Sequence, residues 1–251
     1  MLVARVARVA RAWPNAVAWV VASACVIALF VRVIAPSAMH LTYGFSSYFT
    51  AAHLVREGYD AASFYDDAWF HDQTIRLGFT GAEDIFNVNP PTAALIMLPI
   101  SGLTPQAARL VWTAVEVGAL AAAIAVWARA TASSSVAVAV GVAIVATFQP
   151  LRAELRLGQV YVVLLLLETL ACASLWYGRE RLAGSFVGGM LSFKTGGILL
   201  PLLFIAKRRW TALVAVVALG AVVVLASLPI VGSGAWTTYL RLLVSFGGHE
   251  E

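Results

Sequence analysis

The sequence predicts an all-α membrane protein, a polytopic transmembrane helical bundle that forms one integral membrane domain over residues 1–251. Hydrophobic residues make up 61% of the chain and charged residues 12%, whereas soluble domains average roughly 45–50% and about 25%. Several apolar stretches approach the about 20 residues that a helix needs to cross a bilayer. A polar segment rich in acidic residues separates two of these stretches, and it indicates a function at the membrane surface beyond anchoring.

The first predicted helix covers residues 15–34 and follows a basic arm over residues 1–12. Its apolar run is longer than the core of a signal peptide, and Arg32 and Pro36 stand where a small-residue cleavage site is expected. We therefore predict a retained first helix. Because positive charge favours the cytoplasmic side, we expect a cytoplasmic N-terminus and a multi-pass protein of the cell (inner) membrane. The net charge of +4 has the same origin, so no nucleic-acid partner is expected.

Residues 35–91 are predicted to form an extracytoplasmic loop. The loop contains three of the four histidines and seven of the thirteen acidic residues. Asp60, Asp66 and His40 are candidate catalytic residues, because carboxylates and imidazoles can accept a proton in general base catalysis. The histidines match no compact ligand spacing, so we expect no metal and no other cofactor.

The same loop carries candidate groups for binding a sugar or an acceptor. Tyr48 and Tyr65 suit stacking against a sugar ring, or alternatively anchoring at the membrane interface. Asn87 and Asn89 can hydrogen-bond a sugar. The tandem prolines at 90–91 are explained sufficiently as the start of the next helix.

A helical bundle is expected over residues 92–231. It begins with a short apolar segment that Pro99 interrupts, and this segment is predicted to be interfacial or re-entrant. A tail over residues 232–251 is expected on the extracytoplasmic side. Spans are predicted at residues 106–127, 159–177 and 210–231, and a short one at 136–148 that can extend backwards over residues 133–135.

Residues 184–205 are also long enough to span, but basic residues flank both of their ends. A single span would place one basic cluster outside, against the positive-inside trend. We therefore predict two half-helices broken near Lys194–Gly197. Such non-helical backbone is tolerated at this depth only where it is buried in protein or lines a cavity.

Two arginines, Arg152 and Arg156, lie in a segment over residues 149–158 that is predicted to be an extracytoplasmic turn. Two guanidinium groups can grip one phosphate through paired hydrogen bonds. In a membrane the obvious phosphate is that of a lipid carrier. Arg152 and Arg156, together with Gln159 and Lys194, are therefore our candidate ligands for the phosphate of a lipid-linked donor substrate. The alternative is a surface cluster that snorkels to lipid headgroups.

Glu116, Glu168 and Lys194 lie within apolar segments, where charged groups usually face a cavity or a partner. Glu168 and Lys194 can form a structural ion pair. Alternatively, Lys194 points towards the phosphate of a carrier lipid. Both interpretations stay open at this stage.

The order of these motifs resembles glycosyltransferase family 87, the polyprenol-phosphate-mannose-dependent mannosyltransferases of the GT-C type. The resemblance spans most of residues 40–210. In chain order, the resembling pieces are Phe45–Ala52, Gly58, Phe64–Asp66, Asn89–Pro91, Pro99, Gly158-Gln159, Ala183-Gly184, Lys194, Pro201 and Lys207–Trp210.

The resemblance implies a hexosyltransferase of inverting type. A sugar, mannose in the family, moves from a polyprenyl phosphate to a hydroxyl of a lipid or glycan acceptor on the extracytoplasmic side. The implied partners are therefore a polyprenyl-phosphate-linked sugar, the acceptor and membrane lipids. A carboxylate in the loop after the first helix deprotonates the acceptor, and cationic and polar groups hold the lipid phosphate.

Two departures from the family pattern motivate an alternative function. Family members usually carry an Asp before the Phe of the aromatic motif, whereas this chain has Gly44. Relatives in the family continue through several further helices, whereas this chain ends at Glu251, which suggests a truncated or split product. The alternative is therefore a non-catalytic or truncated relative that binds a lipid phosphate or a partner. A small transporter or flippase is a third possibility, because charged residues lie within the spans.

Overall fold

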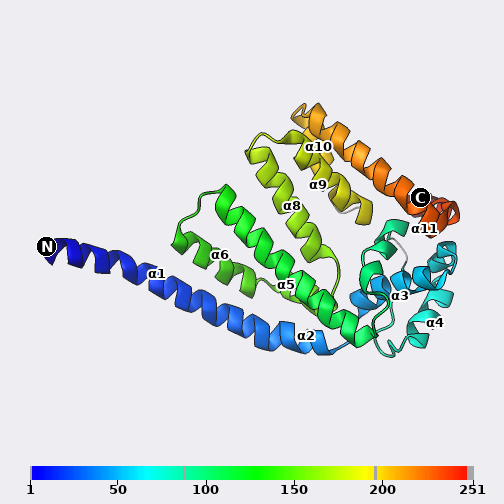
Figure 1. Ribbon diagram of the computed structural model, residues 1–251, viewed down its shortest axis with the longest axis horizontal. Coiled ribbons are helices and arrows are strands. Elements are labelled where there is room, and N and C mark those ends of the chain that lie inside the picture. Colours follow the sequence, from blue (N-terminus) through cyan, green and yellow to red (C-terminus); the bar gives the residue numbers. More distant parts are fainter. Residues whose placement is uncertain (1, 87–88, 195–196, 248–251) are drawn as a thin grey trace.

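The computed structural model describes residues 2–86, 89–194 and 197–247, and every regular element in these ranges is a helix. Asn87, two residues of the predicted break after Lys194 and the last four residues of the predicted tail lie outside the described part of the chain. Figure 1 shows the helices arranged as a bundle, with the N-terminal part of α1 projecting beyond the other helices. The predicted all-α bundle is confirmed.

In chain order the helices are α1 (Leu2–Leu29), the π-helix η1 (Phe30–Ile34), α2 (Ala35–Met39), α3 (Tyr43–Glu57), the 3-10 helix η2 (Ala61–Tyr65), α4 (Asp67–Arg76), the 3-10 helices η3 (Pro91–Leu95) and η4 (Leu98–Ile100), α5 (Pro105–Ala130), α6 (Ser135–Thr147), α7 (Gln149–Leu157), α8 (Tyr161–Trp176), α9 (Glu180–Phe193), α10 (Leu199–Ala206) and α11 (Trp210–Gly247).

Three helical stretches in the described ranges are long and apolar enough to cross a membrane. They are Trp13–Glu57, Pro105–Ala130 and Trp210–Ser245. Helices α6 and α7 add a fourth candidate span if they are taken together, although they are bent by 58° relative to each other. Helix α8 packs between α5 and α9, α9 packs on α11, and α6 packs on α1. These contacts build a polytopic bundle.

The predicted extracytoplasmic loop is largely helical, because its aromatic side chains form a core of their own. Phe45 and Phe49 on α3 stack with ring centroids 5.5 Å apart, and both rings contact Phe79. Phe64 and Phe86 meet edge to face at 5.7 Å. Each of these five rings is essentially inaccessible to solvent. Burying aromatic rings is a large stabilising contribution, so this cluster holds α3 rigidly at one end of the bundle.

The expected turn over residues 149–158 is wrong, because the segment forms helix α7. Pro150 occupies the first turn of α7, where its missing N–H group is tolerated. Gly158 ends the helix in a left-handed conformation, with φ of 67°, which glycine adopts without steric penalty. Leu151 and Leu155 face the interior, so one face of α7 is buried. Arg152 and Arg156 therefore project from a rigid helix.

The predicted break near Lys194 is confirmed. Helix α9 ends at Phe193, and Lys194 has extended backbone angles, φ −158° and ψ 134°. Helix α10 begins at Leu199 and is only eight residues long. Neither half is long enough to cross a bilayer alone. The break therefore leaves Lys194 at the end of a half-helix inside the bundle.

Small residues let α9 and α11 pack closely within the chain. A Cβ atom built on Gly184 would lie 2.0 Å from the backbone oxygen of Ala212, and one on Gly188 would lie 2.7 Å from that of Val216. Backbone atoms cannot move aside as a flexible side chain can. Glycine at these two positions therefore sets the distance between the two helices.

Gly184→Ala is expected to destabilise the protein by about 1–3 kcal/mol, because the added methyl group overpacks the interface between α9 and α11. The matched control is Gly220→Ala on α11, where an added Cβ would meet no atom within 4 Å. Thermal unfolding in detergent should show a lower transition temperature for Gly184→Ala only. Equal transition temperatures for the two variants would contradict the close packing.

Candidate active site

Lys194 lies at the centre of a polar cluster inside the bundle. Its Nζ atom donates to Oδ1 of Asn89 at 2.8 Å and to the hydroxyl of Tyr48 at 3.3 Å. The same ammonium group lies 5.8 Å from the ring centroid of Tyr48 and 5.3 Å from that of Tyr161. Aromatic faces attract a cation in this distance range, so the ammonium is held between two rings and an amide oxygen.

Asn89 is fixed by the loop that leads into the tandem prolines. Its Nδ2 group donates to the carbonyl of Phe86 at 3.1 Å, and its own carbonyl accepts from the hydroxyl of Tyr65 at 2.9 Å. Only 5% of Asn89 is exposed. The structure thus brings Tyr48, Tyr65, Asn89 and Lys194, which lie far apart in the sequence, into one hydrogen-bonded unit.

Two carboxylates lie near this hydrogen-bonded unit but do not form a direct ion pair with Lys194. Lys194 interacts electrostatically with Asp84 from the loop and with Glu154 from α7. Among the described residues, however, the ammonium forms no ion pair at contact distance. The Oε2 atom of Glu154 is buried and has no hydrogen-bond partner in this part of the chain. A positive charge and an unsatisfied acceptor thus lie in the same polar cluster.

Asp84 has an environment suited to accepting a proton. Burial raises the pKa of its carboxyl above the ordinary value, while a hydrogen bond from the Ile85 N–H and the positive charge of Lys194 oppose the rise. By contrast, a hydrogen bond from the Gly81 N–H lowers the pKa of the neighbouring Glu83. A raised pKa makes a carboxylate a stronger base, so Asp84 is a candidate proton acceptor.

The candidate catalytic residues chosen from the sequence have local partners. Asp60 accepts a hydrogen bond from the N–H of Ala62 at the start of η2, and Asp66 accepts one from the N–H of Trp69 at the start of α4. Both are therefore helix N-caps. Nδ1 of His40 lies 2.7 Å from the carbonyl of Pro36. None of these contacts connects the three residues to Lys194.

The four candidate phosphate ligands are distributed over different places. Lys194 lies in the polar cluster, whereas Arg152 lines a cavity between α1, α6 and α7, and the side chain of Arg156 is exposed. Gln159 packs against Gly44, where a Cβ atom would lie only 2.1 Å from Cγ of Gln159. A side chain at position 44 would therefore require the Gln159 side chain to move.

Glu168 does not pair with Lys194. It lines an apolar cavity of about 500 Å³ between α5, α6 and α8, together with Trp127 and Ile144. Glu116 has a different partner, because its Oε2 atom lies 3.4 Å from Nη1 of Arg109. Both members of this ion pair are completely buried.

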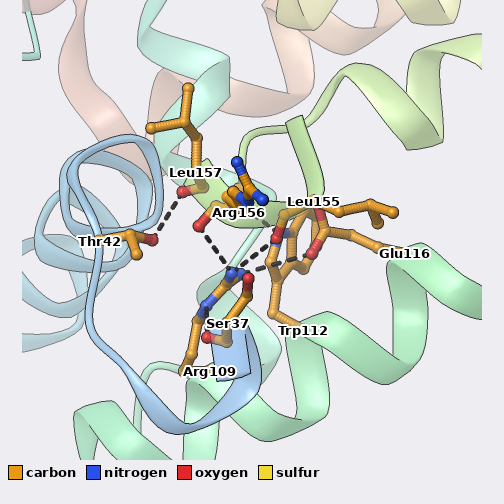
Figure 2. Close-up of polar contacts among 9 residues, drawn as sticks. Ser37, Thr42, Arg109, Trp112, Glu116, Leu155, Arg156 and Leu157 are labelled. Atoms are coloured by element: carbon orange, nitrogen blue, oxygen red, sulfur yellow. Dashed lines mark hydrogen bonds and ion pairs between the residues drawn. The ribbon is translucent and has the colours of Figure 1, made fainter. Parts of the chain in front are cut away.

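Arg109 connects three segments at the end of the bundle that carries the cluster (Figure 2). Its Nε group donates to the carbonyl of Ser37 at 3.1 Å, and its Nη2 group donates to the carbonyls of Leu155 at 2.9 Å and Arg156 at 3.2 Å. These last two carbonyls belong to the final turn of α7, which has no N–H donors of its own for them. Arg109 therefore caps α7 and joins it to α2 and α5.

Neighbouring contacts strengthen this connection, as Figure 2 shows. Nε1 of Trp112 donates to the carbonyl of Gly158 at 2.9 Å, and the hydroxyl of Thr42 donates to the carbonyl of Leu157 at 2.8 Å. A Cβ atom on Gly158 would lie 2.0 Å from Nη1 of Arg109. The end of α7 is thus fixed from both sides, which fixes Glu154 one turn earlier.

Arg109, Asp84 and Glu154 were not identified as site residues from the sequence. A signal for Arg109 existed, because a charged residue inside the predicted span 106–127 requires a partner. Glu116 lies seven residues further along the same helix face, so the pair was detectable. Asp84 is one of seven acidic residues in the predicted loop, and its sequence context does not distinguish it from the other six. No group of three or more metal-binding side chains occurs in the described ranges.

The fold and the cluster define an integral membrane protein with a half-buried, charged site formed by a half-helix end and a loop at one end of a helical bundle. The family model of glycosyltransferase family 87 matches residues 87–250, more than half of the chain, and the protein belongs to this family. It is thus a membrane glycosyltransferase by family. No curated protein and no solved structure matched the chain.

Proposed function

We propose that the protein transfers a hexose, with mannose the expected sugar, from a polyprenyl phosphate to a hydroxyl group of a lipid or glycan. The observation that carries this proposal is the Lys194 ammonium, which is held by neutral oxygens and aromatic rings in the described part of the chain. A cation without a directly bound carboxylate can bind the phosphate of a donor lipid. Its position in a broken helix inside a bundle suits a substrate that is itself embedded in the membrane.

In the proposed reaction, the acceptor hydroxyl attacks the anomeric carbon of the sugar and its proton passes to the carboxylate of Asp84. The bond between the anomeric carbon and the phosphate oxygen breaks, and its electron pair stays on the lipid phosphate. Lys194 stabilises the negative charge that develops there. Tyr48 and Asn89 hold the ammonium in place, while Glu154 balances its charge when no donor is bound.

Asp60, Asp66 and His40 stay alternative candidates for the base. Asp66 and Asp60 belong to the loop where the family resemblance places a catalytic carboxylate, but both are engaged as helix caps. Asp84 belongs to the same loop and interacts with Lys194. We favour Asp84 because a base must lie close to the group that binds the reacting phosphate.

The proposal is tested with purified protein reconstituted into liposomes that contain polyprenyl-phosphate-mannose and a membrane lipid extract. Mass spectrometry of the extracted lipids and glycans should reveal a product one hexose heavier. Donor binding, measured in parallel, separates two failures. Binding without product would favour the alternative of a non-catalytic relative, for which Gly44 at the family's acidic position is the motivation. Absence of both binding and product would refute the proposed function.

The transfer rate is expected to depend on pH through Asp84. The carboxylate must be ionised to accept a proton, and burial raises its pKa, so activity should fall on acidification at a higher pH than for an ordinary exposed Asp. Because the charge of Lys194 opposes this rise, residual activity of Lys194→Met should be lost at a still higher pH. Rate–pH profiles of both proteins test this. An acidic limb that does not move would argue against Asp84 as the base.

We also propose that the protein resides in the cell (inner) membrane with a cytoplasmic N-terminus and the loop outside. The basic arm before the first span supports this orientation. Labelling of single cysteines in intact cells with a membrane-impermeant maleimide tests it. Cysteine at the exposed position Asp72 should react, and cysteine at the exposed position Lys207 should not; the opposite pattern would contradict this topology.

A further inference from the structure

A second cationic site lies on the opposite side of α7 from Glu154. Arg32 and Arg152 line a cavity of about 330 Å³ between α1, η1, α6 and α7. The other lining residues are small or apolar apart from Thr147, and none of them is acidic. Successive α-helical residues are about 100° apart, so Arg152 and Glu154 face different sides of α7. The cavity is therefore distinct from the Lys194 cluster.

The two arginines lack protein partners in the described part of the chain. The Nε group of Arg152 is buried and has no hydrogen-bond partner, and neither arginine forms an ion pair there. A buried guanidinium donor without a partner costs free energy. The hydroxyl of Thr147 already donates to Ala143 and Ile144 within α6. The cavity thus presents donors and positive charge but few acceptors.

The surroundings of Arg32 place this cavity at a lipid-facing surface. Ile27, Phe30 and Val31 are all more than half exposed, as expected for a helix in contact with acyl chains. Arg32 lies close to the end of the predicted first span, at the depth where lipid headgroups begin. An arginine side chain near the end of a span reaches the membrane interface, where the phosphates of membrane lipids are the anions present.

From this geometry we infer that the cavity binds the phosphate of an anionic membrane lipid between Arg32 and Arg152. Two guanidinium groups can together supply several charge-assisted hydrogen bonds to one phosphodiester. The glycerol and upper acyl chains would contact the apolar surface of α1. A lipid bound here joins α1 to α7 and so supports the helix that carries Glu154.

The test uses the full-length protein in detergent and three probes: dioctanoyl phosphatidylglycerol, dioctanoylglycerol and inorganic phosphate. Thermal unfolding is followed as a function of probe concentration, because a ligand that binds the folded state raises the transition temperature. Phosphatidylglycerol should protect the wild type at concentrations at which the other two probes do not. Native mass spectrometry should then show one retained phosphatidylglycerol molecule per chain.

Arg32→Gln and Arg152→Gln should each weaken the apparent affinity for phosphatidylglycerol by roughly tenfold to a hundredfold, as expected for lost hydrogen bonds to a charged group. Arg156→Gln is the matched control, since it removes the same charge from an exposed position of α7 and should retain wild-type affinity. Ala28→Leu keeps both arginines but narrows the cavity that Ala28 lines, so it should also weaken binding.

The inference would be overturned if both arginine variants bound phosphatidylglycerol with wild-type affinity. Equal protection by dioctanoylglycerol would likewise contradict it, because that lipid has no phosphate. Protection by inorganic phosphate in place of the lipid would assign the cavity to a free anion and refute the lipid assignment. If an arginine variant does not fold, the comparison of Ala28→Leu with Arg156→Gln still decides the question.

Discussion

Arg109→Leu is expected to destabilise the protein by about 3–5 kcal/mol, the typical effect of removing one partner from a buried ion pair. The substitution would leave the completely buried carboxylate of Glu116 without its positive partner. It would also remove the donors to Ser37, Leu155 and Arg156. Because the carbonyls of Leu155 and Arg156 lie in the last turn of α7 and are held by Arg109, this helix should lose its fixed position. The free energy of unfolding, measured by denaturant titration in detergent micelles, gives the magnitude.

The double variant Arg109→Leu with Glu116→Leu distinguishes the effect of the unpaired buried charge from the effect of losing the hydrogen bonds that cap α7. Removing both charges eliminates the unpaired carboxylate, so part of the lost stability should return. The carbonyls at the end of α7 would still lack their donor, so recovery should be incomplete. A loss below about 1 kcal/mol for the single variant would contradict the capping role, given that a buried unsatisfied polar group typically costs about 1–3 kcal/mol.

Lys194→Met is expected to reduce the rate of sugar transfer by about a hundredfold to a thousandfold, the range observed when one donor that stabilises developing charge is removed. Methionine retains most of the length of the side chain but cannot bind a phosphate. The reduction should appear in kcat as well as in kcat/KM, because the charge of the leaving phosphate is largest in the transition state. Lys194→Arg should recover part of the rate.

Lys207→Met is the control for this experiment. Lys207 is an exposed lysine that follows α10, and its removal changes the net charge by the same amount. It should leave the transfer rate close to that of the wild type. If Lys194→Met and Lys207→Met had equal rates while both proteins remained folded, Lys194 would not hold the donor phosphate.

The bundle was predictable from the sequence because membrane insertion constrains it strongly. Apolar length revealed the three long spans, whereas the predicted spans 136–148 and 159–177 form shorter helices, α6 and α8. The basic residues on both flanks of 184–205 revealed the break that the structure shows after Phe193. The conformation of residues 149–158 was predicted wrongly. This segment is polar and joins two apolar stretches, so it resembled a turn, yet Pro150 and Gly158 are an N-terminal and a C-terminal helix signal.

The site was only partly predictable. Tyr48, Asn89 and Lys194 were each singled out for separate reasons, but their mutual hydrogen bonds depend on how α3, the proline loop and the broken helix pack together. The position of Asp84 depends on the aromatic core of the loop, which fixes Phe86 two residues later. Local patterns carry no information about such long-range contacts, so the choice among seven acidic residues required the fold.

Asp84→Asn and Asp66→Asn, compared side by side in the reconstituted transfer assay, provide the most direct test of the Lys194-centred site. Asparagine can still cap a helix, so Asp66→Asn should preserve the fold and most of the activity. Asp84→Asn removes the proposed base and should reduce the rate by at least about a hundredfold. Loss of transfer in Asp66→Asn together with full activity in Asp84→Asn would contradict the account and place the base in the cap of α4.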